Sequence, residues 1–194
     1  FDYLKHSKEY GINIKEYDKD FNAVVNRSRN IANDMSKGVN FLMKKNKIDV
    51  IEGFGKIMLN KIVKVTNGKK TQELEAKNII IATGARSRDI PAIPKDGIKI
   101  FGYREAMTLK KQPKSIIIVG SGAIGVEFAY FYNSMGSKVT LIEYLDRLVP
   151  VEDDDISKQL QKSFEKNGID VMTNSEVTSV EKKSTGINVR VMNK

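Results

Sequence analysis

The residues best suited to chemistry in this sequence are three glycines and one acid that follow two apolar segments. Gly120, Gly122 and Gly125 form a G-x-G-x-x-G motif directly after the apolar run 116–119. Glu143 lies 18 residues after Gly125, at the end of the next apolar run. Such a glycine turn lets backbone N–H groups approach a pyrophosphate, and an acid at this distance accepts hydrogen bonds from ribose hydroxyls. The spacing predicts a dinucleotide site.

The acid also indicates which dinucleotide binds. A carboxylate at position 143 would repel a 2′-phosphate, so the sequence favours NAD over NADP. Arg147 follows four residues later and leaves the NADP interpretation open, because guanidinium groups bind phosphates. A glycine-rich turn that binds no ligand is the structural alternative.

The elements around the motif read as strand, helix and strand. The β-branched run 116–119 is typical of a strand buried on both faces. Residues 123–135 are apolar on nearly every side, which predicts a buried helix, and Gly136 is placed to end it. Residues 138–142 form the second predicted strand. The free N–H groups at the start of this helix would then point toward the phosphates.

The first part of the chain predicts a long helix and several strands. Asp18 and Asp20 are N-cap candidates for a helix that extends to about Lys47 and faces a core. Asn67-Gly68 marks a turn between two strands, with a connection slightly longer than two residues. The predicted strands are 48–51, 61–66, 71–76 and 78–82.

Two further segments are candidates for ligand contact. Thr83, Gly84 and Ala85 follow directly after the predicted strand 78–82, at the end of a strand where α/β sheets bind ligands. The glycines that flank Phe54 either make a plain turn or let backbone approach a ligand. Residues 89–114 hold three prolines and are predicted to connect two domains.

Beyond Glu143 the pattern continues with one helix and three strands. The acids Asp153, Asp154 and Asp155 precede a helical pattern, and we interpret them as capping residues rather than as a cation site. The strands expected after that helix are 169–172, 176–181 and 187–191.

Composition excludes several classes of function. The 194 residues include no cysteine and one histidine, His6, which is expected at the surface. Disulfides, thiolate catalysis and histidine metal sites are therefore not predicted, and no metal is expected. The net charge of +9 comes from scattered lysines, so neither nucleic acid nor a membrane is an expected partner. The sequence starts without Met, which suggests a fragment or a processed piece.

The motifs together resemble one family. NIIIATG, GSGAIGVEFA, VTLIE, LDRLVPVEDDDISKQL and NSEVTSV are similar to segments of the pyridine-nucleotide–disulfide oxidoreductases, in particular the dihydrolipoamide dehydrogenases. The resemblance extends over essentially the whole chain. It implies an α/β fold with two Rossmann-like domains, parallel sheets and an antiparallel excursion, both domains being incomplete. These would be a partial FAD-binding domain at 1–88, a connection at 89–114 and an NAD-binding domain at 115–194.

The resemblance also assigns roles to residues. Gly55, Thr83, Gly84 and Ala85 match FAD contacts of the family. The match to the NAD site covers Gly120, Ser121, Gly122, Ala123, Ile124, Gly125, Val126, Glu127, Glu143 and Val177, of which Val177 is assigned by resemblance alone. The family places the equivalent of Glu127 beside the flavin, paired with a lysine, whereas solvent exposure at the crevice is the plainer expectation.

The family pattern also shows what to expect outside this chain. A first FAD glycine motif and a Cys-x4-Cys redox pair should precede it, and a dimer domain with a His–Glu pair should follow. No catalytic residue is therefore expected within the chain, and alone it is expected to be inactive. The intact protein would be a cytoplasmic or mitochondrial-matrix homodimer. Its partner would be a lipoyl domain, either of a 2-oxoacid dehydrogenase acyltransferase or of the glycine cleavage system.

Three alternatives stay open. Another disulfide reductase of the family would share most of these motifs. An NADH oxidase would use the same two cofactors with a single cysteine upstream. A non-enzymatic NAD-binding module would need no cysteine at all.

Overall fold

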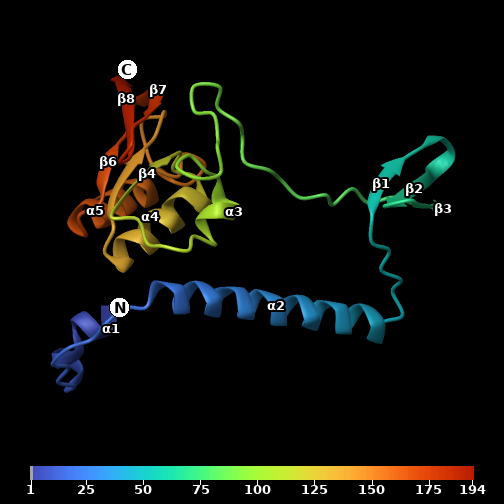
Figure 1. Cartoon of the computed structure of the whole chain (residues 1–194), viewed down its shortest axis with the longest axis horizontal. Helices are drawn as coiled ribbons and strands as arrows, with labels where there is room; N and C mark the ends of the chain where they lie inside the picture. The colour runs from blue at the N-terminus through green and yellow to red at the C-terminus, as the bar shows by residue number, and fades with distance from the viewer. Residues whose placement is uncertain (1) are drawn as a thin grey trace. The chain divides into compact units, whose positions relative to one another are not determined.

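The computed structural model describes residues 2–194, and the chain separates into two units (Figure 1). One unit ends at Asn26 and resumes over Ser87–Lys194, and the other is Arg27–Arg86. Each unit has its own sheet structure and is described by itself. None of the helices in residues 2–194 has the length and apolar character to cross a membrane.

A parallel sheet forms the centre of the first unit. Its strands are β4 (Ser115–Val119), β5 (Lys138–Ile142) and β6 (Asp170–Met172), side by side in that order. Helix α4 (Ala123–Met135) connects β4 to β5, and α5 (Asp154–Lys166) connects β5 to β6. Because all three strands run in one direction, Val119 and Ile142 lie opposite each other at one edge of the sheet. The segments that follow them must therefore meet there.

The core of this unit lies between the sheet and its helices. Tyr132 of α4 and Leu141 of β5 are fully buried, and Phe164 of α5 packs in the same cluster. Phe21, the first residue of α2 (Phe21–Lys45), joins them, with its ring 6.3 Å from that of Tyr132. The Lys19 Nζ atom donates to the carbonyl oxygen of Met135 at 2.9 Å, which satisfies an orphan carbonyl at the end of α4.

Short elements and a hairpin complete the first unit. They are α1 (Asp2–Lys5), η1 (Ser7–Tyr10), α3 (Tyr103–Ala106) and the antiparallel pair β7 (Ser175–Lys182) and β8 (Ile187–Asn193). The connecting segment contacts this hairpin, because Lys182 Nζ lies 2.8 Å from the Asp96 carboxylate. That ion pair, with hydrogen bonds from the N–H groups of Ile100, Ile98 and Lys99, holds the pKa of Asp96 well below its usual range.

The second unit is an antiparallel sheet preceded by most of α2. Strands β1 (Phe54–Ile57), β2 (Ile62–Asn67) and β3 (Lys70–Glu75) lie in sequence order, and the short helix η2 (Leu59–Lys61) connects the first two. Asn67 pairs with Lys70, so the β2–β3 turn has two residues, and the prediction of a slightly longer connection is wrong. Gly68 takes the positive φ of 58° that such a turn requires.

The α/β class, the parallel sheet and the antiparallel excursion are confirmed, whereas two predicted strands are wrong. Residues 48–51 and 78–82 form no strand, and Ile80 and Ile81 are 90% and 70% exposed. A parallel strand needs a neighbour for its backbone hydrogen bonds, and within residues 2–194 none lies beside these segments. The division into FAD, connecting and NAD segments stays a prediction.

Burial also differs from three expectations. Strand β4 has a covered face at Ile116 and Ile118, while Ile117 is 36% exposed, so it is not buried on both faces. In α4, Ile124 and Tyr130 are exposed although most of the helix is apolar. In α2, the apolar stripe beyond the first turns is exposed, for example at Met35, Val39, Phe41 and Leu42. Each of these surfaces lacks a packing partner within the described residues.

Candidate functional site

The three glycines of the motif have three different structural roles. Gly120 takes a φ of +99° and donates its N–H to Ile142 O at 2.8 Å, so it turns the chain at the sheet edge. Gly122 is the N-cap of α4, and a Cβ built there meets no atom within 4 Å. A Cβ on Gly125 would lie 2.0 Å from the carbonyl oxygen of Gly120. Gly120 and Gly125 are therefore required by the fold, while the space above Gly122 is open to a ligand.

The start of α4 provides the donors that face this open space. The first backbone hydrogen bond of the helix runs from Val126 N–H to Gly122 O, at 3.1 Å. The N–H groups of Ala123, Ile124 and Gly125 come before it and are those that a helix leaves without an internal acceptor. With the positive end of the helix dipole they suit a pyrophosphate.

Glu143 lies at the end of β5 and is held by the glycine turn itself. The residue is 7% exposed, and its Oε2 atom accepts from both the N–H and the hydroxyl of Ser121, each at 2.7 Å. Its Oε1 atom accepts from Leu145 N–H at 2.8 Å. A carboxylate has about four acceptor positions, so these three bonds leave capacity on Oε1. Burial of this charge is tolerated because donors surround it.

The loop after β5 folds back on the same turn. Val149 donates its N–H to Ser121 O at 3.0 Å, and Leu148 beside it is fully buried. Val149 has a φ of +39°, a region that a β-branched residue enters only under strain of order 1–3 kcal/mol. Ser121 therefore joins three segments, and its hydrogen bonds hold the glycine turn, Glu143 and this loop together.

Arg147 in this loop is held by an acid of the next helix. Its Nη1 atom forms an ion pair with Asp154, the first residue of α5, and its Nη2 atom donates to Pro150 O at 3.3 Å. Asp153 occupies the predicted N-cap position, but its side chain makes no capping hydrogen bond. The acidic triplet thus lies at the start of α5, as the capping interpretation predicted, but the expected capping hydrogen bond from the Asp153 side chain is absent.

The structure places the remaining predicted NAD residues near this corner or on α4. Ser175 begins β7 and donates its N–H to Glu143 O at 2.9 Å, so Val177 lies on a strand that starts beside the acid. Val177 is 7% exposed and pairs with Val191. Glu127 is exposed on α4, and its predicted role beside the flavin stays a prediction.

The predicted FAD residues all lie in the second unit. Gly55 is in β1, opposite Val65, and is exposed. Thr83, Gly84 and Ala85 lie in an exposed segment without helix or strand, where Gly84 takes a φ of +75°. The role of these four residues in FAD binding stays a prediction.

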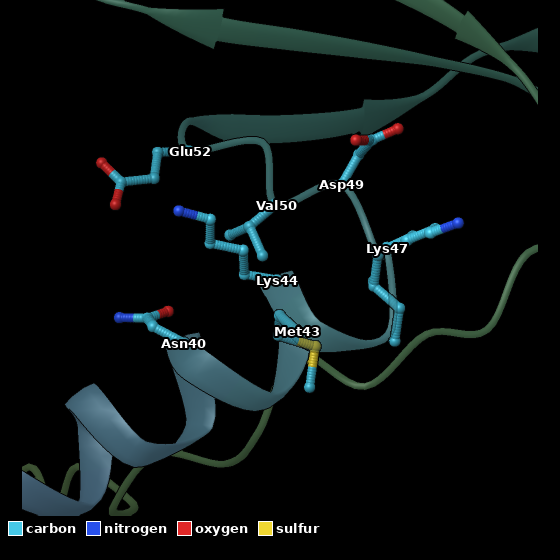
Figure 2. Close-up of a pocket in the computed structure, with 8 residues that line it drawn as sticks. Asn40, Met43, Lys44, Lys47, Asp49, Val50 and Glu52 are labelled. Atoms are coloured by element: carbon cyan, nitrogen blue, oxygen red, sulfur yellow. The ribbon is translucent and has the colours of Figure 1, made fainter.

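A shallow hollow in the second unit is unrelated to the glycine turn. It has a volume of about 480 Å³ and is lined by the end of α2 and the segment after it, including Met43, Lys44, Lys47, Asp49 and Glu52. Figure 2 shows Lys44 and Glu52 extending toward one side and Lys47 and Asp49 toward the other, so the four charged side chains do not converge on one point. Two cations and two anions without a common focus do not define a ligand.

Three contacts at this corner were not revealed by the sequence, namely Ser121 to Glu143, Val149 to Ser121, and Arg147 to Asp154. Ser121 was named only as part of the motif, and its hydroxyl carried no signal, because the residue between two motif glycines is variable by definition. Arg147 did carry a signal, since a basic residue shortly after the ribose acid is the type that binds a 2′-phosphate.

Comparisons with known sequences give a single family. The profile of the pyridine nucleotide-disulphide oxidoreductase family matches residues 5–194. A dihydrolipoyl dehydrogenase of Chlorobaculum parvum is 42% identical over 193 residues, which are 99% of this chain and 41% of that protein. A dihydrolipoyl dehydrogenase of Bacillus subtilis is 37% identical over 182 residues, 89% of this chain and 38% of that protein. The chain thus spans about two fifths of the length of these relatives.

Solved structures agree with the sequence comparison. LpdA from Mycobacterium tuberculosis superposes with a TM-score of 0.87 and 27% identity, over 98% of this chain and 42% of that one. The HOCl-induced flavoprotein disulfide reductase RclA from Escherichia coli, in a Cu(II) complex of a variant, gives a TM-score of 0.78 and 28% identity. That match covers 89% of this chain and 40% of the RclA chain.

Proposed function

The chain belongs to the pyridine nucleotide-disulphide oxidoreductase family, and from this premise we propose that it supplies the NAD-binding part, and a share of the FAD-binding part, of a dihydrolipoyl dehydrogenase. The observation that carries the proposal is that Ser121 of the glycine turn donates two hydrogen bonds to the carboxylate of Glu143, which brings the turn and the acid together. The curated relatives named above support the choice of this enzyme within the family.

The residues of this corner fit the adenosine and pyrophosphate part of NAD. The N–H groups of Ala123 and Ile124 would bind the pyrophosphate, in the space that Gly122 leaves open. The free acceptor position on Glu143 Oε1 would take a ribose hydroxyl. Val177, on the strand that starts beside Glu143, would border the adenine.

FAD would be held by the second unit. Gly55 would lie against its adenosine, and Thr83, Gly84 and Ala85 would form a second contact. When bound, FAD and NAD supply the redox chemistry, while the protein binds and orients them. Glu127, exposed on the first half of α4, would support the nicotinamide pocket.

The proposed substrate and partners follow from the same relatives. The intact enzyme would oxidise dihydrolipoyl groups carried by a lipoyl domain, either of a 2-oxoacid dehydrogenase acyltransferase or of the glycine cleavage system. It would act as a homodimer in the cytoplasm or the mitochondrial matrix. The cysteines and the acid–base pair of this reaction would come from outside this chain, which has no cysteine.

Another disulfide reductase of the family is the second candidate, and the likeness to RclA favours it. The two are separated by an activity comparison on the protein expressed at its natural length with FAD bound. Reduction of NAD⁺ by dihydrolipoamide at a rate well above that with other dithiols supports the first proposal. A protein that prefers NADPH and reduces another disulfide supports the second.

The direct test of the site is a binding titration with NADH. The wild-type protein should bind NADH more tightly than NADPH, and Gly122→Val should lose NADH binding. If the wild type binds neither nucleotide, or if Gly122→Val binds NADH normally, the assignment of this corner is wrong.

A further inference from the structure

The loop between β5 and α5 brings a cation to the ribose end of the proposed NAD site. Val149 N–H donates to Ser121 O, and Leu145 N–H donates to the Glu143 carboxylate. These two bonds fasten the loop on both sides of Arg147, at the corner where the adenosine ribose would lie. Arg147 lies between these two attachment points in the sequence, on the loop that borders the proposed ribose position.

Arg147 is nevertheless not available to a phosphate. Its side chain is 40% exposed, its Nη1 atom is paired with the Asp154 carboxylate, and its Nη2 atom is turned to Pro150 O. The Nε atom is buried and has no hydrogen-bond partner in the described part of the chain. The group is thus half-buried and held at one end by an opposite charge, although it has unused donor capacity.

We propose that Asp154 sets cofactor specificity by withholding Arg147 from a 2′-phosphate. The inference rests on the proposed function of this corner and adds a second carboxylate to it. Glu143 repels the phosphate directly, whereas Asp154 acts through Arg147, by neutralising its charge and fixing its planar donor fork. Asp154 is therefore a positioning residue for discrimination between NAD and NADP.

The test is Asp154→Asn in the protein expressed at its natural length with FAD bound, titrated with NADH and with NADPH. NADPH affinity should rise about fivefold while NADH affinity stays within about twofold, because only NADPH carries the group that Arg147 would bind. The gain should shrink at high salt, since a half-exposed ion pair is screened.

Asp155→Asn is the matched control. Asp155 lies in the same first turn of α5, is 90% exposed and pairs with Lys158 at 3.7 Å. Its replacement removes the same charge from the same helix end without touching Arg147. It should therefore leave the ratio of the two affinities unchanged, and an equal shift in both variants would overturn the inference.

The double variant Arg147→Gln/Asp154→Asn should return the ratio to the wild-type value, and Arg147→Gln alone should not lower NADPH affinity. If Asp154→Asn fails to fold, the single Arg147→Gln variant still tests the inference, because a loss of NADPH affinity there would show that Arg147 already serves the phosphate. If the wild-type protein binds NADH and Asp154→Asn leaves the ratio of NADH to NADPH affinity unchanged, this inference is wrong while the proposed function stands. A wild type that binds neither nucleotide contradicts the proposed function as well.

Discussion

At the scale of single residues, the side chain of Glu143 combines a structural and a proposed binding role. It is an almost buried acid whose three hydrogen-bond donors come from Ser121 and Leu145. Removing the carboxylate would leave these donors unpaired, at a cost of about 1–3 kcal/mol for each buried group. Removing only its charge would spare most of these bonds.

This difference predicts separate outcomes for two substitutions of Glu143. Glu143→Gln should narrow the preference for NADH over NADPH by about tenfold, because the charge that repels the 2′-phosphate is gone. It should cost about 1–3 kcal/mol of stability, because the amide can accept from Ser121 but leaves Leu145 N–H without an acceptor. Glu143→Ala should narrow this preference too, and should lower the free energy of unfolding by about 3 kcal/mol or more, because all three donors lose their acceptor. Titration with both nucleotides and urea denaturation measure the two effects. An unchanged preference for NADH over NADPH in Glu143→Gln would show that Glu143 does not contact the ribose of the nucleotide.

The second and third motif glycines predict a contrasting pair of variants. Gly122→Val places its side chain in open space at a φ of −64°, so the fold should persist at a cost of about 1 kcal/mol while NADH affinity falls at least about tenfold. Gly125→Ala should destabilise the protein by about 2–3 kcal/mol, since its Cβ would meet Gly120 O at 2.0 Å. Thermal melts and NADH titration compare them. A stable Gly125→Ala protein would contradict the packing described here.

At the scale of elements, α4 is fixed by one buried hydroxyl as well as by its apolar face. Tyr132 is fully buried and donates its hydroxyl to Ala106 O at 2.7 Å, which ties α4 to the end of α3. Burial raises the pKa of Tyr132 to about 12, from 10.0. Between pH 10 and about 12, the folded protein therefore keeps the Tyr132 hydroxyl proton that the unfolded chain releases.

The sign of this shift gives a pH prediction. Because the folded pKa is the higher one, the stability from neutral Tyr132 is complete below pH 10 and is lost as the pH rises through about 12. Tyr132→Phe should lower stability by about 1–2 kcal/mol at neutral pH, because Ala106 O loses its donor. Above pH 10 the free energy of unfolding of this variant should also fall less steeply with pH than that of the wild type, which urea denaturation at several pH values would measure. An equally steep decline in the variant would assign the effect to another group.

Elements were predictable where a local pattern decides them and not where a distant neighbour does. Strand β5 and helix α4 have the bounds that their apolar runs predicted, and Gly136 ends α4 in the left-handed conformation. Asp20 caps α2 as expected, accepting from Ala23 N–H at 2.9 Å. The apolar runs 48–51 and 78–82 carry an equally good strand pattern and form none, because a strand depends on a neighbour that its own residues do not encode.

The same limit applies to the site. The glycine turn and Glu143 were identified by spacing, because the βα turn itself sets that spacing. The pairing of Arg147 with Asp154 depends on how the loop 144–153 packs. Strand β1 was not predicted, because Gly53 and Gly55 on either side of Phe54 indicate either a turn or a backbone approach to a ligand rather than a strand. Tertiary contacts, rather than periodicity, decided these features.

At the scale of the whole molecule, the segment at the start of the connection is exposed and lacks regular structure. Residues 78–90 form neither helix nor strand, and they include Arg86 and Arg88, both exposed. One compact unit ends at Arg86 and the other resumes at Ser87. Few contacts hold such a segment, so local opening there costs little.

Limited proteolysis should reveal both this segment and its proposed ligand. Trypsin should cut first after Arg86 or Arg88 in protein stripped of FAD, because exposed backbone without hydrogen bonds enters a protease most readily. Bound FAD should slow this cut, since Thr83, Gly84 and Ala85 are its proposed contacts, whereas NADH alone should not. Mass spectrometry of the first fragments gives the cut position. Equal cleavage with and without FAD would remove these residues from the FAD site.

The 2.0 Å separation between a Cβ at Gly125 and the oxygen of Gly120 has a consequence for recognising such sites in other sequences. The geometry of the turn requires Gly120 and Gly125, so a protein with this fold would retain both glycines whether or not it binds a nucleotide. The proposed ligand is the reason for glycine at position 122, because no atom of the described residues lies within 4 Å of a Cβ placed there. A relative that keeps the outer two glycines and replaces the middle one should therefore have the same fold but not bind the nucleotide. When a motif match is used to infer nucleotide binding, the residue at the middle glycine position is the one to inspect.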